Sequence, residues 1–322
     1  MHVLVTGGAG FIGKHVSAQL IAAGHTVTVL DNLSTGSTAL LPSPARLVVA
    51  DVASPEIAPL LRQERPDAIV HLAAQTSVPH SMRYPVPDER VNIHGMLNLL
   101  SAAAEAGVRR LVFSSSAAVY GNPEAVPLDE ETPIRPLSPY GLSKATAEAY
   151  LRMLGEAYGI SYSILRFANV YGPGQTPEGE AGVVAIFCDR VIRGVAPVIF
   201  GDGHQTRDFV YVEDVAEAVR LATESMRSGE ALHVSSGQAT SILDLWETVR
   251  QVSMEFLAPE QSAVTRKMRA THGEHRPGDI RDSVLDNARI RAALGWSPRT
   301  ALRQGLIRTL RSYLHAEVGR HA

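Results

Sequence analysis

The chain has 322 residues, of which 45% are hydrophobic and 20% charged, and its formal net charge is −3. This length exceeds one small module, and the composition excludes a disordered chain, which would combine few apolar residues with a high net charge. The near-neutral charge argues against a nucleic-acid partner, which usually requires a basic domain. Residues 264–322 hold 12 Lys and Arg against 5 Asp and Glu, and these cations either bind an anion or form a solvated helical face.

The sequence favours a cytoplasmic protein without a membrane partner. Its one cysteine, Cys188, lies beside an apolar run. We expect a packed core thiol, with a reactive thiol as the alternative, and this usage fits a reducing compartment. No stretch approaches the roughly 18 apolar residues of a membrane span. Met1 leads directly into a predicted strand, so no signal peptide is expected.

Short β-branched runs alternate with helix-length segments through the first half of the chain. Strands are predicted over residues 3–6, 26–30, 47–49, 68–71, 110–114 and 162–166, and helices over 11–23, 91–106 and 140–158. Each helix is followed by a glycine that suits a left-handed cap, namely Gly24, Gly107 and Gly159. This alternation predicts an α/β fold with a doubly wound parallel sheet. We expect a Rossmann domain over residues 1–171 and a smaller region over 172–322, with interleaved chain segments.

A glycine-rich turn follows the first predicted strand. Gly7, Gly10 and Gly13 are spaced G-x-x-G-x-x-G, which permits close approach of the backbone to a pyrophosphate at a helix N-terminus. An ordinary tight turn is the alternative. Asp31 ends the next strand, where a carboxylate hydrogen-bonds an adenosine ribose and repels a 2′-phosphate. Because residues 32–41 hold no arginine, NAD is favoured over NADP. Asp51 either flanks the adenine or caps its own loop.

A tyrosine and a lysine lie four residues apart at the start of the third predicted helix. Ser138 is the expected N-cap, so Tyr140 and Lys144 project from one face of the first turns. The preceding strand ends in three serines at the edge of the sheet where such folds bind ligands. A tyrosine base needs its pKa lowered from about 10 toward 7, roughly 4 kcal/mol, most of which an ammonium about 4 Å away supplies. The pair therefore predicts proton abstraction from a hydroxyl, with two unrelated surface residues as the alternative.

These motifs together resemble the extended short-chain dehydrogenase/reductases over nearly the whole chain, and most closely their UDP-sugar 4-epimerase branch. The resemblance implies that Tyr140 is the catalytic base, that Lys144 binds the nicotinamide ribose and lowers the pKa of the tyrosine, and that Ser116 bridges tyrosine and sugar. Ala168 replaces an aromatic residue that many relatives carry. The implied NAD contacts are Gly7, Gly10, Phe11, Ile12, Gly13, Asp31, Asn32, Ser34, Thr35, Gly36, Asp51, Val52, Leu72, Ala73, Ala74, Gln75, Asn92, Ser114, Ser115, Tyr140, Lys144 and Ala168.

The residues after the last serine favour epimerisation over dehydration. Dehydratases of this family place a carboxylate beside the catalytic Ser or Thr, whereas Ala117 and Ala118 follow Ser116 here. The resemblance thus implies an isomerase that takes a UDP-hexose, UDP-glucose or UDP-galactose, through a 4-keto intermediate. Ser283 is small where some relatives have tyrosine, which leaves room for N-acetylated UDP sugars. The alternatives are a 4-epimerase of UDP-glucuronate or another UDP-sugar, and a non-catalytic NAD-sensing protein.

The second half of the chain carries the segments that resemble the family's UDP site. By this analogy Phe200 flanks the uracil, and Arg207 and Arg276 clamp the diphosphate. The implied substrate contacts are Thr76, Ser77, Ser116, Asn169, Val183, Phe200, Arg207, Arg276 and Asp279. No metal is expected, because His272 and His275 lack a third ligand. The resemblance also implies a homodimer, formed through the helices at 91–106 and 140–158.

Overall fold

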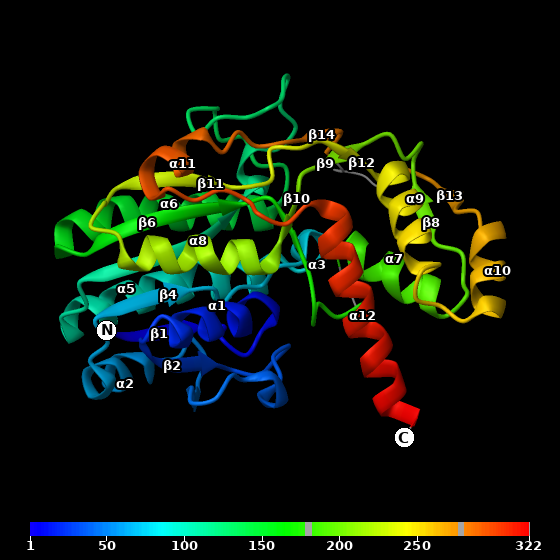
Figure 1. Ribbon diagram of the computed structural model, residues 1–322. Helices are drawn as coiled ribbons and strands as arrows, with labels where there is room; N and C mark the ends of the chain where they lie inside the picture. Colours follow the sequence, from blue (N-terminus) through cyan, green and yellow to red (C-terminus); the bar gives the residue numbers. More distant parts are fainter. Residues whose placement is uncertain (178–181, 276–279, 322) are drawn as a thin grey trace.

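The computed structural model describes residues 1–177, 182–275 and 280–321, and a seven-stranded parallel sheet forms its centre (Figure 1). The strand order β11-β6-β5-β4-β1-β2-β3 confirms the predicted doubly wound α/β fold. The strands are β1 (His2–Thr6), β2 (Thr26–Asp31), β3 (Arg46–Val49), β4 (Ala68–His71), β5 (Arg110–Ser116), β6 (Ser161–Phe167) and β11 (Glu230–Val234). Sequence periodicity missed β11, which returns to the sheet edge beside β6 from the second half of the chain.

Alternate side chains of the sheet enter two separate cores. Val3 and Val5 join the core beneath α1 (Phe11–Ala22), α8 (Val212–Glu224) and α11 (Ala288–Leu294), whereas Leu4 joins the core beneath α2 (Ile57–Glu64), α5 (Gly95–Ala106) and α6 (Pro139–Tyr158). Successive residues of a strand point to opposite faces, so apolar residues throughout the strand require helices on both sides. Burying these apolar faces is the main force that holds the strand ends in place.

The helix ends follow the local sequence signals closely, with one exception. Gly24, Gly107 and Gly159 have φ of 84°, 74° and 68°, which confirms the left-handed caps. The Ser138 hydroxyl accepts a hydrogen bond from the Gly141 N–H at 3.1 Å, which confirms the predicted N-cap. The helix predicted from residue 91 begins earlier, as α4 (Pro85–Glu89), which continues through a π-helical turn, η2 (Arg90–His94), into α5.

The rest of the chain forms shorter elements around a third core, which contains Cys188, Phe187 and Trp246. Cys188 is fully buried and burial raises its pKa, which confirms the packed thiol. The remaining strands are β7 (Asn169–Tyr171), β8 (Val198–Phe200), β9 (Thr206–Arg207), β10 (Phe209–Tyr211), β12 (Thr240–Ser241), β13 (Thr271–Gly273) and β14 (Asp282–Ser283). The remaining helices are η1 (Thr38–Leu40), α3 (Val78–Arg83), η3 (Ala117–Tyr120), α7 (Val183–Ile192), α9 (Ile242–Ser253), α10 (Pro259–Lys267) and α12 (Leu302–His321). Within the described ranges, no helix is long and apolar enough to cross a bilayer.

Candidate active site

The glycine-rich turn between β1 and α1 is closed by backbone contacts that leave no room for side chains. A Cβ on Gly13 would lie 2.2 Å from the Gly7 carbonyl oxygen, and one on Gly7 would lie 2.7 Å from the Ala73 nitrogen. Gly7 also has φ of 69°, a conformation that only glycine adopts easily. In the described part of the chain, no side chain caps α1 at Gly10. The N-terminal N–H groups of α1 therefore suit the phosphate oxygens of a dinucleotide.

Asp31 joins the glycine-rich turn to the loop that follows β2. Its carboxylate accepts hydrogen bonds from the Ala9 N–H at 3.0 Å and from the Leu33 N–H at 2.8 Å. The following loop packs on the turn, since a Cβ on Gly36 would lie 3.0 Å from the Cβ of Ala9. A carboxylate has more acceptor positions than these two bonds use, so Asp31 retains capacity for a ribose hydroxyl. The acceptor positions of Asp31 and the N–H groups at the start of α1 both fit NAD.

The carboxyl end of β4 leads into a loop that hydrogen bonds to the π-helical turn. The Asn92 side chain accepts a hydrogen bond from the Gln75 N–H at 2.9 Å and donates to the Gln75 carbonyl at 3.0 Å. The Asn92 amide also donates to Ser143 Oγ in α6 at 3.0 Å. Asp51 accepts from the Ala53 N–H at 2.8 Å and from the Asn32 amide at 3.2 Å, so it caps its own loop and faces the loop after β2.

Ser116, Tyr140 and Lys144 meet where β5 ends and α6 begins. The Ser116 side chain lies beside the Tyr140 hydroxyl, near enough to lower the pKa of the phenol. The Lys144 ammonium donates to the Ser114 carbonyl at 2.9 Å and lies 6.0 Å from the centroid of the Tyr140 ring. The structure thus brings together the three residues for which catalytic roles were predicted.

The pKa of Tyr140 shifts opposite to the direction predicted from the sequence. Burial raises it above 10, the Asp88 carboxylate raises it further, and the Ser116 side chain lowers it in part. In the protein alone, the loss of hydration around the phenol outweighs any lowering by positive charge, and the lowering by Lys144 in the complex with NAD stays a prediction. Burial also lowers the pKa of Lys144, to about 8, which leaves it mostly protonated at neutral pH.

The middle serine of the triplet is hydrogen bonded to a buried ion pair that the sequence analysis missed. Ser115 Oγ donates to Glu148 Oε1 at 2.6 Å. Arg166 donates to both carboxylate oxygens of Glu148, at 2.9 and 2.6 Å, and this bidentate pairing raises the pKa of Arg166 despite its burial. Glu148 lies one helical turn after Lys144 on α6, so this spacing could have indicated that it faces the same site. Its partner Arg166 lies on β6 and could not be recognised from the spacing.

The predicted substrate residues of the second half lie on short strands and at a helix start. Ser283 of β14 is in register with Arg207 of β9, and Phe200 ends β8. Val183 is the first residue of α7, and the Asn169 N–H donates to the Asp208 carbonyl at 2.9 Å. The remaining members of the predicted set, Arg276 and Asp279, lie outside the described residues, as does part of the glycine-containing segment before α7, 179–181.

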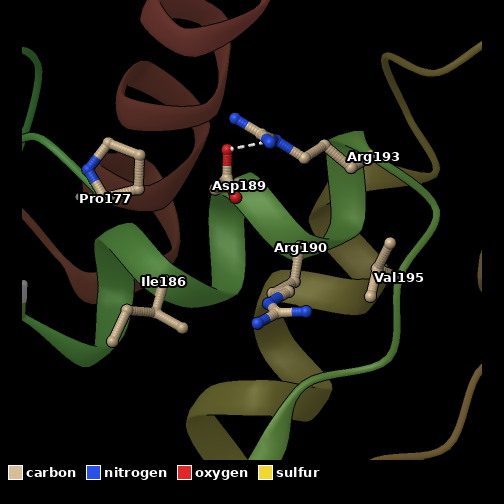
Figure 2. A pocket seen from close by; sticks show the side chains of 6 residues that line it. All are labelled: Pro177, Ile186, Asp189, Arg190, Arg193 and Val195. Carbon is tan, nitrogen blue, oxygen red and sulfur yellow. Dashed lines mark hydrogen bonds and ion pairs between the residues drawn. The ribbon is translucent and has the colours of Figure 1, made fainter. Parts of the chain in front are cut away.

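Two further surface features are not part of this constellation. The His272 ring hydrogen bonds to the Gly201 carbonyl at 2.8 Å. Figure 2 shows a pocket beside α7, where Asp189 and Arg193 form an ion pair at 2.8 Å. It is lined by Pro177, Ile186, Asp189, Arg190, Arg193 and Val195 and by none of the predicted site residues.

Comparison with known proteins assigns the family. A family model described as the NAD dependent epimerase/dehydratase family matches residues 3–235. The chain belongs to this family. It is 41% identical over 316 residues to a UDP-glucose 4-epimerase of Mycolicibacterium smegmatis, with 96% of this chain and 97% of that protein covered.

Solved structures of relatives have the same fold as this family member. The UDP-glucose 4-epimerase of Thermotoga maritima, crystallised with UDP-glucose, has a TM-score of 0.92 and 39% identity, with 98% of this chain and 100% of that chain covered. The UDP-glucose 4-epimerase of Thermus thermophilus, in complex with NAD, has a TM-score of 0.89 and 40% identity at the same coverage. Both structures align with 98% of this chain, so the likeness includes its second half.

Proposed function

We propose that this protein is an NAD-dependent isomerase that interconverts UDP-glucose and UDP-galactose by inverting C4 of the sugar. The observation that carries the proposal is the meeting of Ser116, Tyr140 and Lys144 beside a dinucleotide turn, with Ala117 and Ala118 following the serine. Eliminating water would require a further acid and base at that position. Oxidation and reduction at one carbon require a single proton acceptor, which Tyr140 supplies. The full-length likeness to UDP-glucose 4-epimerases supports this reaction.

In the proposed reaction, Tyr140 removes the proton of the C4 hydroxyl and Ser116 holds the hydroxyl and the phenol in line. NAD, held by the glycine-rich turn and Asp31, would supply the acceptor and donor of the C4 hydride. Tyr140 gives its proton back to the oxygen of the 4-keto sugar when C4 is reduced on its other face. The raised pKa of Tyr140 means that the cationic groups in the complex, of which Lys144 is the nearest in the chain, must stabilise the phenolate.

The predicted NAD contacts fall into three groups in this proposal. The glycine-rich turn holds the pyrophosphate, and the loops after β2 and β3, with Asp31, hold the adenosine. The loop after β4, with Gln75 and Asn92, lies toward the nicotinamide end beside Lys144. The second half of the chain binds UDP, with Arg207 and Arg276 on the diphosphate. Most of the proposed UDP contacts then come from residues after 171, whereas Thr76, Ser77, Ser116 and Asn169 come from the first part of the chain. The elements α8, α11 and β11 complete the cofactor domain.

Replacing the base tests the assignment directly. Tyr140→Phe should lower kcat for UDP-galactose by at least about 100-fold, the usual contribution of a positioned general base. The protein should retain NAD, which absorbance after denaturation measures. Activity within tenfold of the wild type would show that another residue is the base. Purified protein that retains NAD but turns over no UDP-sugar would instead favour the non-catalytic alternative.

A second substrate class follows from the size of Ser283. This residue is 8% exposed and lies in register with Arg207, the proposed diphosphate ligand, so in this proposal a tyrosine there would narrow the sugar site. We propose that the enzyme also accepts UDP-GlcNAc and UDP-GalNAc. Ser283→Tyr should then abolish turnover of the N-acetylated sugars and spare UDP-galactose. A panel that includes UDP-glucuronate and pentose analogues separates this from the other UDP-sugar alternatives.

We also propose that the enzyme is a cytoplasmic homodimer, formed through α5 and α6. The apolar side chains of Leu142 and Met153 on α6 are 56% and 60% exposed, which suits a helical interface. Light scattering should give twice the 34.6 kDa chain mass, and Met153→Glu should yield monomer. The single core thiol, Cys188, supports the reducing compartment, which cell fractionation tests.

A further inference from the structure

Ser81 is a buried polar residue in a short, mostly exposed helix. It lies in α3 and is 0% exposed, whereas Met82 and Arg83 beside it are exposed. A buried hydroxyl is costly unless it is hydrogen bonded. Ser81 Oγ donates to the Val78 carbonyl at 2.7 Å and accepts from the Tyr140 N–H at 3.1 Å. This hydroxyl therefore joins α3 to the backbone of the proposed catalytic base.

The start of α6 shows why the second of these bonds matters. The first N–H groups of a helix have no acceptor within the helix. Pro139 has no N–H to satisfy. Ser138 accepts from the Gly141 N–H with its side chain at 3.1 Å and from the Leu142 N–H with its carbonyl at 2.9 Å. The N–H of Tyr140 lies between these positions, and its acceptor is the hydroxyl that α3 supplies.

The carbonyl of Tyr140 is also bonded to a buried serine. Ser143 Oγ donates to this carbonyl at 3.0 Å and accepts from the Asn92 side chain at 3.0 Å. Asn92 is itself hydrogen bonded to the backbone of Gln75, in the loop after β4. Two residues farther along this loop, Ser77 is the N-cap of α3. Both backbone polar groups of Tyr140 are thus connected, through one serine each, to the loop after β4.

We propose that Ser81 is a positioning residue for Tyr140. By accepting the Tyr140 N–H, it holds the first turn of α6 against α3 and so fixes the place of the phenol beside Ser116. A base must lie within hydrogen-bond reach of the proton that it removes, so a small displacement of the helix start slows the reaction. The catalytic consequence rests on the proposed function, whereas the hydrogen bond does not. Because Ser81 acts through the base, its loss should lower kcat and spare substrate binding.

Ser81→Ala removes the acceptor and leaves the rest of α3 unchanged. Ser253→Ala is the matched control, because Ser253 is 1% exposed and its hydroxyl likewise donates to the carbonyl three residues earlier, at 2.8 Å, but in α9. The holoenzymes are assayed with UDP-galactose for kcat and KM. NMR of protein that contains 15N-labelled tyrosine then observes the N–H groups of the nine tyrosines without any turnover. Tyr140→Phe identifies the signal of Tyr140.

Ser81→Ala should lower kcat by about tenfold, the order of magnitude that one positioning hydrogen bond contributes. KM and the retained NAD should stay within about twofold of the values for Ser253→Ala, since binding contacts are unchanged. The Tyr140 N–H should exchange with solvent at least about tenfold faster in Ser81→Ala, because its protection depends on the lost bond.

A kcat of Ser81→Ala within about twofold of that of Ser253→Ala would overturn the positioning role, as would a loss of activity explained by a raised KM or by lost NAD. If the wild type turns over no UDP-sugar, the proposed function fails instead, and an unchanged exchange rate of the Tyr140 N–H in Ser81→Ala would overturn the link itself. If Ser81→Ala does not fold, a wild-type Tyr140 N–H that exchanges as fast as an unprotected amide would overturn it.

Discussion

Glu148 of α6 is hydrogen bonded to Ser115 of β5, and Glu148→Gln removes the charge of this carboxylate with little change in volume. Glu148 and Arg166 are 1% and 2% exposed, and three hydrogen bonds of 2.6 to 2.9 Å end on the carboxylate. The variant leaves the Arg166 guanidinium buried without an anion, which costs about 3–5 kcal/mol. For a chain of this size that loss lowers Tm by roughly 10 °C.

Calorimetry of Glu148→Gln beside Glu105→Gln tests this reasoning. Glu105 pairs with Arg62 at 2.7 Å, yet both side chains are about half exposed, at 51% and 55%. Solvent screens such a pair, so its loss should cost less than about 1 kcal/mol. Glu148→Gln combined with Arg166→Met should be less destabilised than the sum of the single variants. Equal effects of the two Gln variants would refute the argument from burial.

Three further predictions follow from the site. Gly13→Ala places a Cβ 2.2 Å from the Gly7 carbonyl, so it should yield protein without retained NAD; normal retention would contradict this. Ser115→Ala should change kcat less than about threefold, whereas Ser116→Ala, which removes the hydroxyl beside the base, should lower it more than about tenfold; equal kcat values would contradict this contrast. Burial lowers the pKa of His71 to about 3, so between pH 6.5 and pH 3 the unfolded chain takes up a proton that the folded chain does not. The free energy of unfolding, measured with urea, should therefore fall by about 2 kcal/mol from pH 7 to pH 5, and an NMR signal of protonated His71 at pH 5 would disprove the cause.

Local signals predicted six strands of the central sheet, the helix caps and the residues that meet at the sheet edge, because each depends on short-range geometry. Ser138, Gly159 and the serine triplet are examples whose sequence context is sufficient. The buried charges were not predictable in this way. Glu148 becomes recognisable as part of a buried ion pair only in the folded chain, where Arg166 comes from another element, since burial and pairing are properties of the tertiary fold.

Two differences between the predictions and the structure have definite physical causes. The helix predicted from residue 91 begins earlier, at Pro85, because prolines fit well in the first turn of a helix. The prediction for the pKa of Tyr140 counted nearby positive charge and omitted burial. Burial acts on the phenolate in the opposite direction and dominates in the protein.

The π-helical turn Arg90–His94 allows one continuous helical segment to direct its side chains into two different environments. Each residue of a helix rotates the next by about 100°, so an additional residue in one turn shifts the phase of everything beyond it. Before the turn, Asp88 accepts a hydrogen bond from the Gln75 side chain. After the turn, Met96 and Leu99 enter the apolar core. Deleting one residue within the turn would rotate one half by roughly 100° against the other. The number of residues in this turn thus determines which side chains point toward the active site and which point into the core. A one-residue deletion here should therefore disrupt the enzyme even if every side chain named above were retained.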